Sequence, residues 1–479
     1  MDTVRSVLNI SPRPGIATTR ERLVVPSLAL LLFIVVANNT SAIVAQPAIA
    51  AEFTAGPADV GWVIFGYTAA FAVATALYGG LAARIPIHRL IGVGAGLLSL
   101  GSLAAAFAPS LGGLIAARLL QGLGAGALPT LASALIARRF EGAARAKSLG
   151  IIVAAVAAGQ AIGPLAGGVL LEVAGWRAAV APGLVAALVG VAAVALAAEP
   201  RGVARPVGGA ERFDRLGAVI AAAAAFSAVY AINRLPLLGI SASTLLAGFA
   251  AILLCVVVAR RRPAAGRPFL RWDVIVSRRY ARLALLAASG VSAFLGLLVI
   301  FPLAMASGHG LEGIRAGVML VPMALAAAVL SVNIARVQAR LGRQRTTVIS
   351  LTSLAAAALL FAILGVDGPL GLQLLPLALV GAGYGMLTSP LVNELSAMRD
   401  DPREQPQVIG TFYIVSFLGG AAGGALATAV IQRGLEAGPL ASPGLPGYST
   451  AAFLLGLAPA ACAAWLWIGT RPRLRRAIR

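Results

Sequence analysis

The chain has 479 residues, of which 59% are hydrophobic and only 11% are charged, whereas charged residues make up about 25% of a typical soluble domain. This composition, with long uncharged runs throughout, excludes a soluble globular protein and indicates a polytopic helical membrane protein. The net charge of +21 does not indicate a nucleic-acid partner, because the basic residues lie in short segments between the apolar runs.

Fourteen uncharged runs are long enough to be membrane-spanning helices, which take about 20 residues each. The run between Arg215 and Arg234, with 18 uncharged residues, is the shortest of them. The expected helices are 24–47, 60–82, 90–108, 112–135, 148–171, 177–198, 216–233, 236–259, 283–304, 316–335, 346–366, 370–393, 407–431 and 450–470.

The distribution of Lys and Arg predicts how the chain lies in the membrane. With the N-terminus placed inside, 33 of the 38 basic residues fall in inner segments and four in outer segments, while Arg118 lies within a span. An asymmetry that persists through every crossing supports an even number of helices. The sequence therefore predicts a multi-pass protein of the cell's inner membrane, with both tails, 1–23 and 471–479, in the cytoplasm.

Two parts of the chain resemble each other and indicate an internal repeat. A short basic inner loop follows both 60–82 and 316–335, and glycines at four-residue spacing occur in both 148–171 and 407–431. Parallel repeats of this kind are typical of transporters whose site lies at the midplane between two halves. The expected organisation is an all-α membrane protein with six-helix halves at 24–198 and 283–470, and with 199–282 carrying an inserted helix pair, 216–233 and 236–259.

The fifth expected helix differs from a plain lipid-facing span. Gly159, Gly163 and Gly167 recur at every fourth residue and therefore share one face, with Pro164 and Gly168 beside them. A face of small residues lets a neighbouring helix approach closely, and a proline inside a helix favours a bend. Such a helix suits a seam against which another part of the protein moves, although small faces also occur in static bundles.

Polar side chains inside the spans are the candidate functional residues, because unpaired polar groups are costly in hydrocarbon. Arg118 either orients a proton path or an anionic substrate group, or it is bonded to backbone carbonyls or reaches the outer surface. The run Asn38, Asn39 and Thr40 either lines a pathway or joins helices. Glu394 is either a coupling carboxylate or a solvated charge at a helix end. Since no buried carboxylate is apparent, a neutral or anionic substrate fits as well as a cationic one.

Motifs in the fourth and fifth helices give the chain a family resemblance. The fourth reads RxxQGxGxG from Arg118 to Gly126, and the fifth reads GxxxGPxxGG from Gly159 to Gly168. The chain resembles the major facilitator superfamily over nearly its whole length, and within it the fourteen-helix drug:proton antiporters. The resemblance implies an exporter of small amphipathic organic compounds that works by alternating access and exchanges them for protons. The expected pathway and coupling residues are Arg118, Gln121, Asn38, Asn39, Thr40 and Gln160, and the expected antiporter hinge is Gly159, Gly163, Pro164, Gly167 and Gly168.

The first helix departs from the family pattern. Relatives carry Asp-x-Thr there, whereas this chain has Asn38, Asn39 and Thr40 at the matching positions, so the carboxylate is absent. The departure weakens the expectation of proton exchange more than the expectation of export.

The inner-loop motif is also incomplete. Gly79, Leu81 and Arg84 are retained, but Ala83 stands where the family has an acid, and Ala339 stands at the same position of the second copy. In the family this acid is thought to hold the inner gate through a neighbouring helix end. The resemblance therefore implies that the usual latch is missing here.

The sequence carries no catalytic constellation and no phosphate-cradling GxxxxGK[ST] loop, so neither an enzyme nor ATP-driven transport is expected. Cys255 and Cys462 lie within expected spans, and no metal site or cofactor is expected. The expected partners are the lipid bilayer, a small-molecule substrate and protons, with the protein as a monomer. The alternatives are a gradient-driven uniporter or importer of a neutral or anionic metabolite, and a non-transporting membrane sensor, which the short inner loops disfavour.

Overall fold

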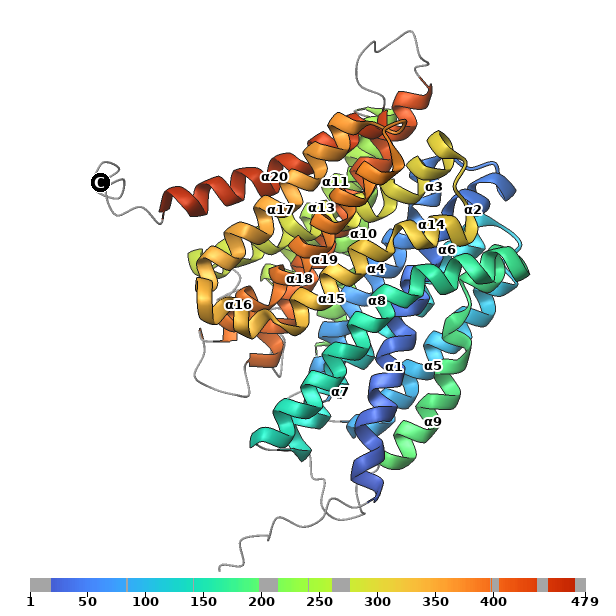
Figure 1. Cartoon of the computed structure of the whole chain (residues 1–479). Helices are drawn as coiled ribbons and strands as arrows, with labels where there is room; N and C mark the ends of the chain where they lie inside the picture. The colour runs from blue at the N-terminus through green and yellow to red at the C-terminus, as the bar shows by residue number, and fades with distance from the viewer. Residues whose placement is uncertain are drawn as a thin grey trace, which may run out of the picture.

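The computed structural model describes residues 19–82, 85–140, 142–197, 214–239, 241–260, 276–396, 398, 405–436 and 447–469. Within these residues the chain forms helices and no strand (Figure 1). Thirteen helices are long and apolar enough to cross a membrane, and the shorter apolar helix Pro182–Leu196 brings the number to fourteen in this part of the chain. The predicted all-helical class is confirmed, and the predicted number of fourteen spans agrees with this count when the shorter helix is included.

The N-terminal half is built around its first helix. This helix, α1 (Thr19–Val44), packs along α8 (Gly142–Ala179) on one side and against α9 (Ala186–Ala197) on another. The other elements of this half are α2 (Gln46–Glu52), α3 (Pro57–Val60), α4 (Trp62–Leu81), α5 (Ile87–Ala106), α6 (Leu111–Ala125), α7 (Ala127–Arg139) and the 3-10 helix η1 (Pro182–Val185).

The sixth span begins later than the expected 177–198. Gly175 has a φ of 75°, a left-handed conformation that glycine adopts without strain, and the chain turns there at the end of α8. The next helical turn begins at Pro182, a residue that is favoured at helix starts because it lacks an N–H. The predicted start was wrong because the turn at Gly175 and the proline at position 182 determine where this helix begins, whereas the prediction used the start of the apolar run.

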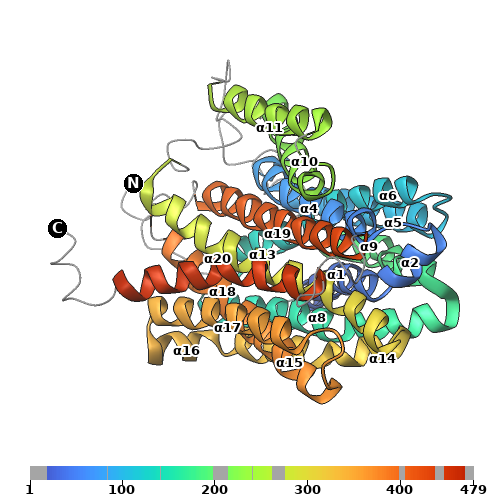
Figure 2. The ribbon, with the colours of Figure 1, turned by 90° about the horizontal axis from the view of Figure 1, so that it is seen from above.

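The inserted pair consists of α10 (Arg215–Leu238) and α11 (Ala242–Arg260). Helix α10 packs against α4 and α19 (Gln405–Glu436), while α11 packs on α10 at the edge of the bundle (Figure 2). The expected span 216–233 is too short, because α10 continues past Arg234. The guanidinium of Arg234 lies 2.8 Å from a carboxylate oxygen of Asp59, and this ion pair lets a charge sit inside the helix end.

The C-terminal half is centred on α13 (Arg278–His309), which is the most buried of the long helices. It packs along α19 and against α18 (Leu370–Ser396) and α20 (Gly447–Gly469). The other helices of this half are α14 (Gly313–Met319), α15 (Val321–Val332), α16 (Ile334–Leu341), α17 (Arg343–Leu364), α18 (Leu370–Ser396) and α20 (Gly447–Gly469).

Two helix pairs join the halves, namely α8 with α14–α15 and α4 with α19. We call these contacts the seam. We call the end of the bundle that carries α2, α3 and α14 the α3 end, and the opposite end, with α7 and α16, the α16 end (Figure 1). Hydrogen bonds between described residues also join the two halves at the α3 end. The amide of Ala58 donates to Oε1 of Gln432 over 3.1 Å, and the amide of Ile314 donates to Oε1 of Glu172 over 2.9 Å.

Candidate transport site

Arg118 is the centre of a buried polar network in the N-terminal half. It lies on α6 and is fully buried. Its Nε donates to the carbonyl oxygen of Val63 over 2.9 Å, Nη1 to Oε1 of Gln121 over 2.6 Å, and Nη2 to Oδ1 of Asn39 over 3.0 Å. The ring of Tyr67 covers the guanidinium, with its centroid 4.4 Å from Cζ. All of these partners are neutral, so the charge is held by dipoles and a ring face.

Gln121 connects this cation to three further elements. Its Oε1 also accepts from Nδ2 of Asn38 over 3.4 Å, and its Nε2 donates to Oγ of Ser102 and to the carbonyl oxygen of Val180 over 2.8 and 3.0 Å. Oδ1 of Asn38 accepts from the amide of Gly183 over 2.9 Å. The network therefore fixes α1, α5, α6 and the start of η1 relative to one another.

The expected pathway residues do not all belong to this network. Asn38, Asn39, Arg118 and Gln121 meet in it, whereas Thr40 donates to the carbonyl oxygens of Val36 and Gly159 and so ties α1 to α8. Gln160 is partly exposed on α8, and no hydrogen bond described for this part of the chain links it to Arg118.

Four glycines of α8 allow close helix contacts on two sides. Gly159, Gly163 and Gly167 pack on the backbone of α1, and a methyl group at Gly163 would overlap the Thr40 hydroxyl. Gly168 instead meets α14 of the other half, beside the backbone of Gly313. The proline of the motif takes part as well, because a methyl group at Gly317 would lie only 2.6 Å from the carbonyl oxygen of Pro164.

Helix α19 repeats this arrangement in the C-terminal half. Gly419, Gly420 and Gly423 pack on α13, while Gly424 faces Phe65 of α4 in the other half. In both α8 and α19, glycines thus press the helix against the first helix of its own half and one more glycine meets the opposite half. The two copies of the glycine pattern occupy equivalent positions across the seam.

The carboxylates of the described chain lie near helix ends. Glu394 accepts from Nη2 of Arg282 over 2.7 Å, and Nε of Arg279 lies 3.7 Å away, so it is an ion-paired helix-end charge. At the α3 end, Arg177 pairs with Glu52 at 2.8 Å. The Arg177 guanidinium, together with the Trp176 indole N–H, holds the pKa of the exposed Glu52 carboxyl below its ordinary value.

The inner-loop motif is only partly described. Gly79 lies near the end of α4 and faces the methyl group of Thr130 on α7, and Leu81 is the last residue of α4. Arg84 lies outside the described residues.

Several residues of the site were missed by the sequence reasoning. Ser102 joins the network through Gln121, and nothing in its surroundings in the sequence marks it. Phe71, Tyr413 and Phe417 were missed as well, and with Tyr67 they form the ring pairs Tyr67–Phe71 and Tyr413–Phe417 at the seam. A signal for the pairs was available, because both are spaced i, i+4 on a single face of a glycine-containing helix.

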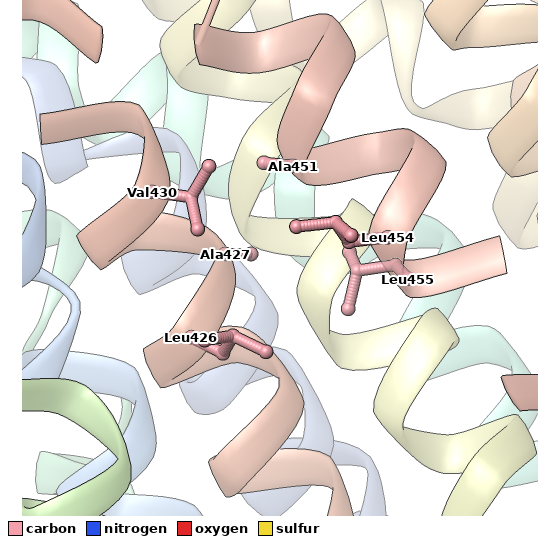
Figure 3. Close-up of a pocket in the computed structure, with 6 residues that line it drawn as sticks. All are labelled: Leu426, Ala427, Val430, Ala451, Leu454 and Leu455. Carbon is pink, nitrogen blue, oxygen red and sulfur yellow. The ribbon is translucent and has the colours of Figure 1, made fainter. Parts of the chain in front are cut away.

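A small depression between α19 and α20 is entirely apolar (Figure 3). It has no polar group that could orient a ligand, so it is packing imperfection and not a site. The residues that line the depression are Leu426, Ala427, Val430, Ala451, Leu454 and Leu455.

In the described part of the chain, no group of three or more His, Cys, Asp or Glu residues is arranged to hold a metal ion.

Comparison with known proteins defines the class of this molecule. The family model of the Major Facilitator Superfamily matches residues 28–424. The chain belongs to this superfamily, and it is a multi-pass membrane transporter of small molecules and not an enzyme. The predicted family and the predicted fold, two six-helix halves with an inserted pair, are confirmed.

Relatives include proteins named for antibiotic resistance and export. The chain is 27% identical over 329 residues to a methylenomycin A resistance protein of Streptomyces coelicolor, a match covering 68% of each chain. It is 30% identical over 418 residues to the cephamycin export protein CmcT of Amycolatopsis lactamdurans, covering 85% of this chain and 84% of that one. It is also 22% identical over 371 residues to the riboflavin transporter RibZ of Clostridioides difficile, covering 77% of this chain and 79% of the other.

The fold is shared with solved transporter structures. A crystal structure of a point mutant of the peptide transporter POT superposes with a TM-score of 0.67 at 17% identity and covers 94% of this chain and 95% of that chain. A bacterial homologue of the lysosomal transporter Spinster, crystallised inward-facing and unoccupied, has a TM-score of 0.59 at 18% identity and covers 95% of this chain and 96% of the other.

Proposed function

We propose that this chain exports small amphipathic organic compounds across the inner membrane by alternating access, as a monomer with both termini in the cytoplasm. The observation that carries the proposal is the glycine seam. Gly168 and Gly317 bring the backbones of α8 and the α14–α15 segment into contact across the halves, and a smooth contact of small residues is a surface on which two rigid halves can rock. The names of the resistance and export relatives support the direction of transport.

The charge of the substrate follows from the charges of the spans. Away from helix ends, Arg118 is the charged side chain that the described spans contain. A cationic compound at the midplane would have no carboxylate to pair with, and it would be repelled by the guanidinium. Neutral or anionic compounds are therefore the proposed substrates.

Exchange for protons is the form of coupling that the family resemblance implies, and we adopt it as the proposal. In this chain the position of the family's acid is Asn38, which is buried and bonded to Gly183 and Gln121. With an amide there, the remaining carboxylates of the described chain lie near helix ends. Glu172, whose side chain reaches the other half, is one of them.

Reconstituted vesicles test export and coupling together. A panel of neutral, anionic and cationic amphipathic compounds is loaded, efflux is measured as loss of the compound from the vesicles, and proton movement is measured with a pH-sensitive dye in the lumen. We expect efflux of neutral or anionic compounds with counterflow of protons, and Asn38→Asp should make efflux more pH-dependent. Efflux that moves no protons and ignores an imposed pH gradient would refute the antiport, and an absence of efflux for every compound would refute export.

Import of a metabolite is the second candidate function, because one relative is named a riboflavin transporter. The same vesicles separate the two functions. Movement of the compound down its own concentration gradient in either direction, with no accumulation driven by a pH gradient, would favour a uniporter or importer.

A further inference from the structure

Six aromatic rings lie inside membrane spans of both halves, and all of them except Tyr67 lie outside the polar network around Arg118. They form one group that crosses the seam and a second group within the C-terminal half. The rings are Tyr67 and Phe71 on α4, Phe294 on α13, Tyr384 on α18, and Tyr413 and Phe417 on α19.

The first group is a continuous line of rings that starts at the buried cation. Tyr67 covers Arg118, and the rings of Tyr67 and Phe71 are 6.3 Å apart and nearly parallel, with 19° between their planes. Phe71 meets Phe417 of the other half edge-on, with 5.4 Å between centroids and 81° between planes. Phe417 and Tyr413 continue the line at 5.9 Å and 22°. The line therefore joins the polar site of one half to the wall of the other.

The second group is a tight stack of Phe294 and Tyr384, whose centroids are 3.7 Å apart with 9° between planes. The direction of Tyr384 follows from its neighbours on α18. Gly385 touches α15, and Leu387 touches Gly290 of α13. At 100° per residue, Tyr384 lies between these two contacts, on the side of α18 that faces neither α17 nor the lipid.

The rings on α19 point into the bundle. Ile414 and Leu418 pack beside α10, which covers the lipid side of the seam, and Gly419 packs on α13. Tyr413 and Phe417 therefore lie on the remaining face, the one that Gly424 turns toward α4.

Exposure distinguishes these rings from the aromatic packing nearer the α3 end. Phe65, where Gly424 closes the seam, is fully buried. In contrast Phe71, Tyr384, Tyr413 and Phe417 are each partly exposed, although they sit within membrane spans and face inward. Partly exposed rings on inward faces are surfaces that a ligand can cover.

We propose that the four partly exposed rings, Phe71, Tyr384, Tyr413 and Phe417, are the binding surface for the transported compound, with the buried rings of Tyr67 and Phe294 behind them, and that this compound is a planar aromatic molecule without a positive charge. The inference deepens the export function proposed above and rests on it. Flat rings gain from offset and edge contacts with Phe and Tyr beyond the area they bury. Arg118, behind Tyr67, disfavours a cation and favours an acid or hydroxyl group at that end of the line.

Binding to the full chain in lipid nanodiscs tests the proposal with three probes. Anthracene-9-carboxylate is the planar aromatic acid, its fully saturated analogue has the same charge without the rings, and ethidium is a planar cation. We expect the aromatic acid to bind at least about tenfold more tightly than either of the others, because several ring contacts each contribute about two- to tenfold. Equal binding of the aromatic and saturated acids would overturn the ring surface, and ethidium binding as tight as the acid would overturn the charge preference.

Variants place the binding on the named rings. Phe417→Leu and Tyr384→Leu should each weaken binding of anthracene-9-carboxylate about two- to tenfold. Neither variant should change the binding of the saturated acid, and Tyr384→Phe should bind the aromatic acid as tightly as the parent. Phe249→Leu is the matched control, since Phe249 is 63% exposed on α11 and lies away from the seam. Thermal unfolding in nanodiscs checks the fold, and Tyr413→Leu replaces any variant that unfolds. Unchanged affinity in folded ring variants would overturn the assignment.

The test also separates this inference from the function beneath it. Efflux of saturated compounds that no ring variant alters would overturn the aromatic site and leave export standing. Ring-dependent binding of the aromatic acid, with no efflux of any compound, would overturn export and leave the site.

Discussion

The two halves share a packing scheme but differ in their buried polar groups. In the N-terminal half, Arg118 and Gln121 bond to side chains from other helices, so the polar atoms recognise one another across the bundle. In the C-terminal half, buried hydroxyls bond to backbone carbonyls. Ser289 donates to Leu286 over 2.9 Å and Ser350 to Gly383 over 2.7 Å.

This difference shows that the repeat has kept the packing surface and not the chemistry. The glycines of α8 and α19 occupy equivalent places, because both helices must slide against a neighbour. The charge is present in one half, and the facing wall offers rings and methyl groups. The asymmetry assigns polar recognition to the N-terminal half and apolar contact to the C-terminal half.

Removing the charge of the N-terminal network is the strongest way to test this division. Arg118→Ala removes the donor to Asn39 and Val63 and one of the two donors to Gln121, and we expect efflux to fall about 100-fold or more. Gln373→Ala is the control in the other half, where the buried amide donates to the carbonyl oxygen of Gly365. It should change efflux less than about threefold. Comparable losses in both variants would contradict the division.

Blocking the seam should harm transport from either half, since the packing surface is duplicated. A side chain at Gly168 would collide with Gly313, and one at Gly424 would collide with Phe65, so Gly168→Val and Gly424→Val should each lower efflux about tenfold. Gly150→Val is the control on α8, because Gly150 has open space around it. If only the α8 variant loses efflux, the two glycine faces are not equivalent.

Loosening the inserted pair should have a smaller effect. Asn233 is fully buried on α10, and it accepts from Nε1 of Trp62 over 3.2 Å and donates to the carbonyl oxygen of Ala425 over 3.2 Å. It thereby bonds to both halves, and Asn233→Ala should lower unfolding stability by about 1 kcal/mol. Hydrogen exchange of α4 and α19 at the α3 end should rise, whereas Ser243→Ala on the exposed start of α11 should leave it unchanged.

The smallest expected effect is a pH dependence at the α3 end. The pKa of Glu52 is lowered by the Arg177 guanidinium and the Trp176 N–H, so the ionised form is favoured in the folded protein. Its contribution to stability is therefore present above the unfolded pKa and is lost as the pH falls through the lower, folded value. Thermal unfolding from pH 7 downward should show a smaller acid loss in Glu52→Gln than in the parent. If the parent and Glu52→Gln lose thermal stability equally as the pH falls, Glu52 does not contribute to the pH dependence.

Much of the fold follows from the sequence, because length, hydropathy and Lys/Arg placement are local quantities. Fourteen apolar segments and the glycine spacing are read directly from the chain, and so is the motif that places Arg118 and Gln121 one turn apart. The meeting of Asn38 and Asn39 with this pair depends on how α1 and α6 are placed in the folded bundle, and the spacing of these residues in the sequence does not give that.

The contacts that escaped prediction join residues far apart in the chain. Phe71 and Phe417 meet only because α4 packs on α19, and nothing in either segment names its partner. The length of α10 was predicted too short for the same reason. Arg234 is accommodated inside this helix because it pairs with Asp59 on α3, which is far away in the sequence.

The edge position of α11 makes the bilayer itself part of the working protein. Leu246, Phe249 and Ile252 are 68%, 63% and 67% exposed on this helix, so acyl chains cover them. Helix α11 packs on α10, and α10 is bonded through Asn233 to both halves. A thinner or thicker membrane that tilts this helix pair should therefore change the contact between the two halves. In vesicles made from lipids of different acyl length, we expect the efflux rate to vary with that length.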